Sequence, residues 1–312
     1  MTLPRRVRVE ARAKLNLGLA IGPRRPDGFH ELATFFQSVT LADTLVAERR
    51  ARGFSLELRH EESAARGRLH PSTRAAVPAG SGNLALRAAR LAVHHAGLRG
   101  GVHLSLTKRI PAQAGLGGGS ADAAATLVAV FALYGVPVPL GDRLALGERL
   151  GSDVPFALFG GTALGLGRGE KLDRIRPGRP FRALIAVPRW RVPTSLAFQK
   201  LDRSRYGLTQ WRAKLRFAKA AGRVGLRPHR VLGLGNSFEE VLGSRLSGFV
   251  GLCARMREAG VREPHLTGSG SAVFGLLGAG VPARSVLNRF AGDETLYVVR
   301  SAGSGLRVRR LY

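Results

Sequence analysis

Cysteine is almost missing from this chain of 312 residues, in which Cys253 stands alone. A single thiol cannot close an intrachain disulfide or build a cysteine-rich metal site, so nothing in the composition points to an oxidising compartment. The helical pattern around Cys253 predicts that it lies in the core.

Acidic residues are also scarce, with 21 Asp and Glu against 49 Lys and Arg, which gives a net charge of +28. Such an excess attracts any polyanion, so charge alone does not choose between nucleotides, nucleic acid and acidic membranes. Aromatic residues make up only 6% of the chain. They do not interleave with basic residues as a platform for single-stranded nucleic acid requires. We therefore expect a solvated basic surface and no specific nucleic-acid partner.

A long apolar segment is missing as well. Charged residues near the N-terminus interrupt the apolar run that a secretory signal needs. The longest uncharged stretch, residues 123–140, has a glycine and two prolines near its end, which stop its helix after about three turns. We interpret it as a buried helix in a cytoplasmic protein without membrane contact.

The apolar pattern changes between strand and helix periods along the chain. In the first half it predicts strands at 7–21, 33–46 and 102–110, a loop at 59–82, helices at 83–96, 120–134 and 140–159, and a strand or turn at 162–172. Ser120 is the expected cap of its helix. In the second half it predicts strands at 182–187, 265–277 and 296–308, helices near 237, 247 and 283, and a basic, poorly patterned segment at 203–230. The sequence thus predicts an α+β protein with an N-terminal domain at 1–170 and a C-terminal domain at 171–312.

A glycine-rich loop joins the strand at 102–110 to the next helix. Four glycines precede a helix whose first turn has small side chains, so backbone amides can approach a ligand closely. Inward-turned N–H groups and the positive end of the helix dipole form a cradle for phosphate, although a purely structural turn is the alternative. The predicted ATP site consists of Pro111, Ala112, Gln113, Ala114, Gly115, Leu116, Gly117, Gly118, Gly119, Ser120 and Ala121.

Other nucleotide motifs are absent from the sequence. It has no Gly-Lys dipeptide for a Walker loop, no Gly-x-Gly-x-x-Gly for a Rossmann turn, and neither of the His-Arg-Asp and Asp-Phe-Gly motifs of protein kinases. What remains, Pro-x-x-x-Gly-Leu-Gly-Gly-Gly-Ser, resembles the nucleotide loop of the GHMP kinases, the superfamily of galactose, homoserine and mevalonate kinases.

Three further groups of segments narrow this resemblance. They are Ala-Lys-Leu-Asn-Leu at 13–17 with Arg-Arg-Pro-Asp-Gly-Phe-His-Glu-Leu at 24–32, then 151–156 with 160–163 and 167–170, and finally 266–274. In this order they resemble the 4-diphosphocytidyl-2-C-methyl-D-erythritol kinases, ATP-dependent enzymes of the non-mevalonate isoprenoid pathway. The resemblance implies an N-terminal domain with a left-handed βαβ crossover, a C-terminal ferredoxin-like domain, and an active site between them.

The resemblance also implies roles for individual residues. Asp153 matches the catalytic base and Lys14 the catalytic lysine, while the substrate side matches Asn16, Phe29, His30, Thr194 and Phe198. Phosphoryl transfer needs a proton acceptor, an oriented hydroxyl and positive charge, which these residue types supply. ATP with Mg²⁺ is implied as the phosphoryl donor, and no metal ligand is assigned. The plainer alternatives are a helix cap for Asp153, a solvated strand position for Lys14, core packing for the two phenylalanines and a structural hydrogen bond for His30.

Three positions depart from the family pattern. Phe29 stands where Tyr is usual, Ala121 where a second Ser is usual, and Arg12 where Pro is usual. The loss of a hydroxyl at residue 121 removes one contact to phosphate or magnesium, whereas Phe29 keeps its stacking face. Two alternatives remain open: a GHMP kinase for another small alcohol, and a basic nucleic-acid-binding protein on a retired kinase scaffold.

Overall fold

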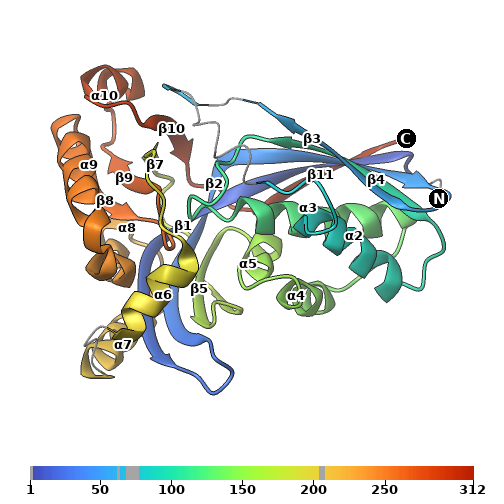
Figure 1. The fold of residues 1–312 in the computed structure, drawn as a ribbon, viewed down its shortest axis with the longest axis horizontal. Helices are drawn as coiled ribbons and strands as arrows, with labels where there is room; N and C mark the ends of the chain where they lie inside the picture. The colour runs from blue at the N-terminus through green and yellow to red at the C-terminus, as the bar shows by residue number, and fades with distance from the viewer. Residues whose placement is uncertain (1–2, 62–63, 68–76, 204–207) are drawn as a thin grey trace.

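The structure, a computed structural model, describes residues 3–61, 64–67, 77–203 and 208–312. It contains two β-sheets that lie beside each other, with the N- and C-termini close together at the far end of the first sheet (Figure 1). Parts of the expected loop at 59–82 and of the basic segment at 203–230 lie outside the described residues.

The first sheet has seven strands. Its central order is β11-β1-β2-β4-β3, and β5 pairs with β2 and with β6. The bounds are β1 Arg6–Arg24, β2 His30–Arg50, β3 Phe54–His60, β4 Gly101–Lys108, β5 Thr162–Gly167, β6 Lys171–Arg174 and β11 Leu306–Leu311. Because β3 and β4 are parallel and α2, Leu84–His95, lies between them in the chain, they form a βαβ unit. The left hand of this crossover stays a prediction.

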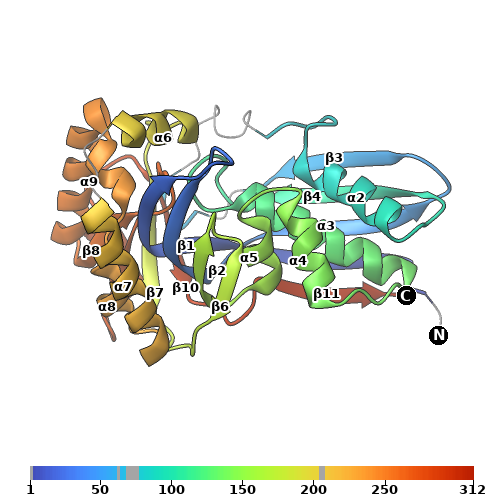
Figure 2. The same ribbon diagram turned by 90° about the horizontal axis from the view of Figure 1, so that it is seen from below.

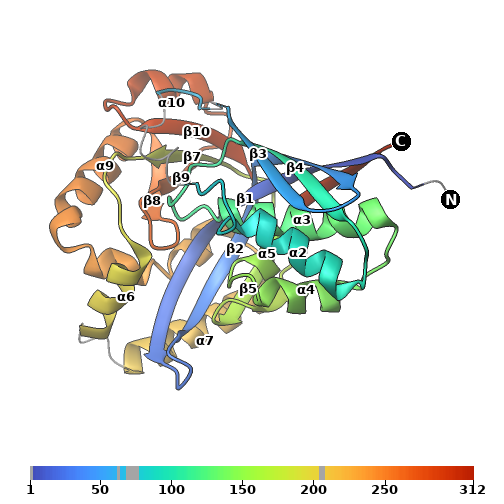
Figure 3. The ribbon, with the colours of Figure 1, turned by 45° about the vertical axis from the view of Figure 1, so that its right-hand side comes forward.

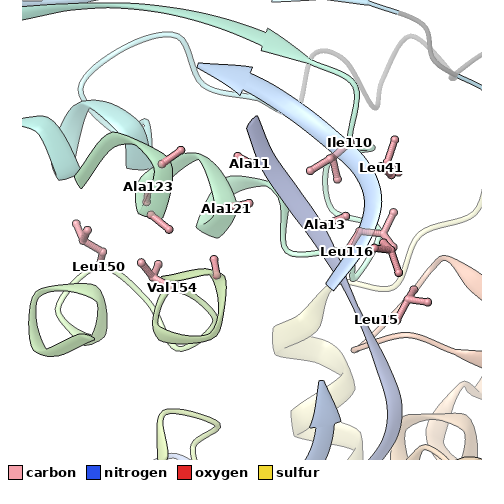
Figure 4. Close-up of a cluster of buried hydrophobic side chains, with 14 of the residues drawn as sticks. Ala11, Ala13, Leu15, Leu41, Ile110, Leu116, Ala121, Ala123, Leu150 and Val154 are labelled. Carbon is pink, nitrogen blue, oxygen red and sulfur yellow. The ribbon is translucent and has the colours of Figure 1, made fainter. Parts of the chain in front are cut away.

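A layer of helices covers one face of the first sheet (Figures 1 and 3). They are α2, α3 (Gly118–Tyr134), α4 (Leu140–Glu148) and α5 (Val154–Phe159). The expected buried helix is α3, whose alanines allow it to pack closely on β1. Figure 4 shows Ala121 and Ala123 of α3 near Ala11 and Ala13 of β1, all within one hydrophobic core.

The second sheet has the order β10-β7-β9-β8, and all neighbouring strands are antiparallel. Its strands are β7 Arg182–Val187, β8 Val261–Leu266, β9 Val273–Leu277 and β10 Thr295–Arg300, with α9 (Leu246–Glu258) before β8 and α10 (Ala283–Arg289) after β9. This βαββαβ succession confirms the ferredoxin-like C-terminal arrangement. Cys253 of α9 is buried, as expected, and burial raises its pKa to about 12.

The long β1–β2 hairpin connects the two halves, as Figure 3 shows. The first parts of β1 contribute to the core of the first sheet, whereas Leu19 and Ile21 belong to the core of the second. The helix α7, Leu208–Val224, packs against the far end of this hairpin, and the Trp211 ring leaves no room for a side chain at Gly22. The hairpin is therefore held both by the core of the second sheet and by α7.

Two expectations were wrong in detail. The cap of α3 is Gly117 and not Ser120, which lies inside the first turn. The expected helix at 140–159 is two helices, because Gly151 and the residues after it turn the chain between α4 and α5. The basic segment, for which the sequence pattern indicated no element, forms α7 and the short helix α8, Pro228–Leu232, where it is described.

The expected boundary between residues 170 and 171 stays a prediction, although β6 and β11 follow it in the chain and belong to the first sheet. The remaining described elements are α6 (Thr194–Arg203) and two 3₁₀ turns at Ser237–Val241 and Gly243–Arg245. Across the described ranges, no helix has both the length and the apolar character to cross a membrane.

Candidate active site

A cavity of about 740 Å³ lies where the β1–β2 hairpin, the glycine-rich loop and the start of α6 meet. It brings together residues that are far apart in the chain. The walls include all seven predicted catalytic and substrate-side residues: Lys14, Asn16, Phe29, His30, Asp153, Thr194 and Phe198.

A second cavity of about 410 Å³ lies along the other side of the glycine-rich loop. All the predicted ATP-site residues from Pro111 to Ser120 line it. The two cavities share four residues of the loop, namely Gln113, Gly115, Gly117 and Ser120. The loop therefore separates two adjoining spaces, as a site for two substrates requires.

Ala121 differs from the rest of the predicted ATP site. Its side chain is buried in the core (Figure 4), and its amide donates to the Gly117 carbonyl at 2.9 Å. Its methyl group and its N–H are thus both used inside the fold.

The loop is held by backbone contacts with two distant segments. Lys14 N donates to Leu116 O at 3.0 Å, and Ala272 N donates to Ala114 O at 3.1 Å. Gly115 has a φ of +78°, and a Cβ there would lie 2.0 Å from the Thr267 carbonyl oxygen, so only glycine fits. The segment at 266–274 thus packs directly against the glycine-rich loop.

Lys14 and Asp153 face each other in the larger cavity, with 3.5 Å between Nζ and Oδ2. Lys14 is 7% exposed, and the register of β1 against β2 shifts on either side of it. Such bulges re-aim side chains, which explains why a strand lysine points into the site. Asp153 begins α5 but makes no side-chain cap hydrogen bond, so its carboxylate is available to the cavity.

Asn16 continues the polar network from Lys14. It accepts a hydrogen bond from Lys14 Nζ through Oδ1 and donates through Nδ2 to Thr34 Oγ1 at 2.8 Å. The Asn16 backbone N–H donates to Thr267 Oγ1 at 3.0 Å. These contacts fix the Lys14 ammonium between an amide oxygen and the Asp153 carboxylate.

His30 lies at the opposite end of the same cavity. Nδ1 is 3.0 Å from the Gly22 carbonyl oxygen, which can only accept, and Nε2 is 3.1 Å from Asp202 Oδ1. The ring stacks on Phe198 with 5.2 Å between centroids. Both ring nitrogens are therefore engaged within the protein, and Asp202, which the sequence did not indicate, orients this histidine.

Phe29 is open to the cavity rather than packed in the core. It is 49% exposed, and the Arg168 guanidinium lies 4.9 Å from its ring centroid. The core alternative for Phe29 is therefore wrong. Arg168 belongs to the motif at 167–170, but nothing in that motif predicted its contact with Phe29.

Two further contacts close the cavity over the loop. Thr194 Oγ1 lies 2.7 Å from Ser269 Oγ, and Arg191 Nη1 donates to Gln113 Oε1 at 2.9 Å. Sequence reasoning missed Arg191 and Ser269, because their contacts join segments about 75 residues or more apart. Within the described part of the chain, no group of three His, Cys, Asp or Glu is placed to hold a metal ion.

Comparison with known proteins agrees with this geometry. The family profile described as "GHMP kinases N terminal domain" matches residues 83–161. A 4-diphosphocytidyl-2-C-methyl-D-erythritol kinase of Moorella thermoacetica is 37% identical, with 93% of this chain and 94% of that protein covered. The same enzyme of Solibacter usitatus is 36% identical, with 100% and 93% covered.

Solved structures give the same result for the fold. The crystal structure of a 4-(cytidine 5'-diphospho)-2C-methyl-D-erythritol kinase has a TM-score of 0.72 at 35% identity and covers 95% of this chain and 100% of its own. A homoserine kinase from Cytophaga hutchinsonii also reaches 0.72, with 99% of each chain covered, but its 17% identity shows the fold alone. This chain therefore belongs to the 4-diphosphocytidyl-2-C-methyl-D-erythritol kinase family of the GHMP kinases and is an ATP-dependent small-molecule kinase.

Proposed function

We propose that this enzyme transfers the γ-phosphoryl group of ATP to the 2-hydroxyl of 4-diphosphocytidyl-2-C-methyl-D-erythritol, releasing ADP, within the non-mevalonate isoprenoid pathway. The observation that carries the proposal is the pair of adjoining cavities with the glycine-rich loop between them and Lys14 and Asp153 in the larger one. The name of the relatives supplies the substrate.

ATP binds along the loop in this proposal and enters as its magnesium complex. The cradle fits a polyphosphate, because glycine backbone lines the cavity and the first turn of α3 presents amide groups without intrahelical partners. The Gln113, Gly115, Gly117 and Ser120 positions shared by both cavities bring the γ-phosphoryl group to the acceptor side. Ala121 contributes no hydroxyl, so the backbone carries more of the binding.

Asp153 acts as the general base in the proposed step. Its carboxylate accepts the proton of the 2-hydroxyl as the oxygen attacks the γ-phosphorus, and the bond to the ADP oxygen breaks. Lys14, held by Asn16 and by Asp153, orients the hydroxyl and offsets negative charge on the transferring group.

The aromatic end of the cavity recognises the cytidine part. Phe29 presents an open ring face for stacking on cytosine, and His30 and Phe198 form a second, pre-stacked surface. Both ring nitrogens of His30 are engaged within the protein, so the ring has no free edge with which to hydrogen-bond the cytosine. His30 instead supports the stacking surface, and its contact with Asp202 holds the ring in place. Thr194 lies beside Ser269 at the cavity wall between the two ends.

A coupled assay of ADP release tests the proposal. We expect turnover with 4-diphosphocytidyl-2-C-methyl-D-erythritol and none above background with homoserine or mevalonate at equal concentration. Homoserine and mevalonate carry no nucleobase that could fill the aromatic end of the cavity. Turnover of homoserine or mevalonate without turnover of the cytidine compound would show instead a GHMP kinase for another alcohol.

A further inference from the structure

Three ionisable side chains are buried beneath the glycine-rich loop, away from the Lys14–Asp153 pair. Lys108 ends β4 and is 4% exposed, Asp43 of β2 is fully buried, and Asp122 of α3 is 3% exposed. The Lys108 ammonium donates to Asp43 Oδ2 and, at 2.6 Å, to Asp122 Oδ2. The cluster thus joins the strand before the loop to the helix after it.

The two carboxylates have unequal surroundings. Asp43 accepts hydrogen bonds from Lys108 and from the backbone N–H groups of Arg109 and Ile110, the latter at 2.8 Å. Asp122 accepts only from Lys108, and its Oδ1 is buried without a hydrogen-bond partner among the described residues. Hydrogen-bond donors stabilise the charged form of a carboxyl group, and Asp122 has fewer of them than Asp43.

The charge balance then favours a proton on Asp122. With both carboxylates ionised, the cluster would hold a net charge of about −1 away from water, which is costly. Burial raises the pKa of Asp122 to about 8, against the opposing attraction of Lys108 and with a further rise from Asp43. Although burial alone would lower the pKa of Lys108, its two carboxylate neighbours raise it above its ordinary value, so the ammonium remains charged.

This cluster forms part of the wall of the smaller cavity. Lys108 and Asp122 both line it together with the loop. A Cβ at Gly118 would lie 3.3 Å from Lys108 Nζ, so the first turn of α3 rests directly on the buried ammonium. Any charge that appears on Asp122 is therefore close to the phosphates that the loop is proposed to bind.

We propose that Asp122 is a positioning residue of the nucleotide site that works in its protonated form, and that loss of its proton weakens nucleotide binding. This proposal rests on the assignment of the loop as the ATP site. Below about pH 8 the proton stays on Asp122 and the cluster is neutral. Above that pH the proton leaves to solvent, and the cluster carries a negative charge beside the phosphates.

Calorimetric titration with ADP between about pH 7 and about pH 9.5 tests this inference, because ADP itself is already ionised across that range. We expect the Kd of the parent enzyme to rise about fivefold across the range, because a negative charge on Asp122 repels the phosphates. The Kd of Asp122→Asn should equal that of the parent at the lower pH and stay flat. Asp142→Asn, which removes an exposed carboxylate on α4, should follow the parent.

An infrared difference spectrum between the parent and Asp122→Asn near pH 7 gives an independent readout. We expect the carbonyl band of a protonated carboxyl group to be lost in the variant. The inference would be overturned if the Kd of Asp122→Asn changed with pH in the same way as that of the parent enzyme. It would also be overturned if the variant lost no carbonyl band. An Asp122→Asn variant that fails to fold would overturn it as well, since the amide has the same shape and no charge. A parent enzyme that binds no ADP would reject the loop assignment instead, while the infrared band still reports on the proton.

Discussion

At the scale of single residues, the proposed reaction depends on two side chains from distant elements. Lys14 comes from the irregular middle of β1, and Asp153 from the turn that separates α4 and α5. The two charged groups lie 3.5 Å apart. The Asp153 side chain is 36% exposed, whereas the Lys14 side chain is only 9% exposed. The more accessible partner is thus the one proposed to take the proton.

Replacing Asp153 with Asn should remove most turnover and leave nucleotide binding largely intact. The amide cannot accept the hydroxyl proton, and loss of general-base catalysis typically costs about 10² to 10⁴ in rate. Steady-state kinetics together with ADP titration would measure both effects. Asp173→Asn, an exposed carboxylate on β6, is the matched control. An Asp153→Asn variant with the turnover of the parent would eliminate Asp153 as the base.

Replacing Phe29 tests the proposed cytosine contact. Stacking on a base is worth about 1 to 3 kcal/mol, so Phe29→Ala should raise the KM for the cytidine substrate with a smaller effect on ATP. Phe29→Tyr adds one hydrogen bond at most and should change that KM by no more than about tenfold. Phe54→Ala is a control, because its ring also lies beneath an arginine, Arg90, but outside the cavity.

Because Phe29 is 49% exposed, the melting temperature should hardly change in Phe29→Ala. An unchanged KM with a clearly lowered melting temperature would mean that the ring supports the fold instead of the substrate.

At the scale of elements, local patterns predicted most strands and helices but not their exact ends. The strand at 182–187 was predicted to the residue, because it is a short apolar run that follows Arg182 and ends before Pro188. The helix at 140–159 was drawn too long, since the turn at Gly151 depends on the contacts of α5 with the sheet. The cap of α3 was misplaced, because Gly117 takes a positive φ that tertiary contacts of the loop impose.

The cavity residues also divide into those that local sequence predicts and those that only the fold brings into place. Lys14, Asn16 and Asp153 could be predicted, since each lies in a motif with a recognisable local sequence. Arg191 and Asp202 could not, because their partners Gln113 and His30 lie far away in the chain and only the fold brings them together.

The buried cluster beneath the loop should also contribute to stability. Asp43→Ala removes one of the two acceptors for Lys108 and the acceptor for two backbone N–H groups, and these donors remain buried. Breaking a buried ion pair costs about 3 to 5 kcal/mol, so urea unfolding should show a loss of that size. Asp173→Ala, on exposed β6, should change the unfolding free energy little. A loss below about 1 kcal/mol for Asp43→Ala would show that the cluster does not hold the loop.

At the scale of the whole molecule, the proposed reaction assigns no role to most of the net charge of +28. Part of this charge forms a stripe along α7. Figure 2 shows the helix α7 at the outer side of the molecule. The exposed residues of this stripe recur every three or four positions: Arg212, Arg216, Lys219 and Arg223. The opposite side of α7 carries Trp211, Ala218 and Ala221 into the core.

This surface should bind nucleic acid weakly and without sequence preference. Exposed basic residues act through counterion release, so replacing the four stripe residues by Glu should flatten the dependence of log K on log salt by about 3 to 4 units. Fluorescence titration at several salt concentrations measures this slope. Kinase activity should not change. Tight, sequence-selective binding that survives high salt would support the nucleic-acid alternative.

The most direct test of the account is the phosphorus NMR spectrum of a reaction that contains the purified enzyme, magnesium, ATP and 4-diphosphocytidyl-2-C-methyl-D-erythritol. We predict a new resonance from a phosphomonoester group on the 2-oxygen, with the product formed in equal amount to ADP. We predict that this resonance is absent with Asp153→Asn. If the cytidine compound stays unmodified by folded enzyme while homoserine or mevalonate gains a phosphate, the proposed substrate is wrong.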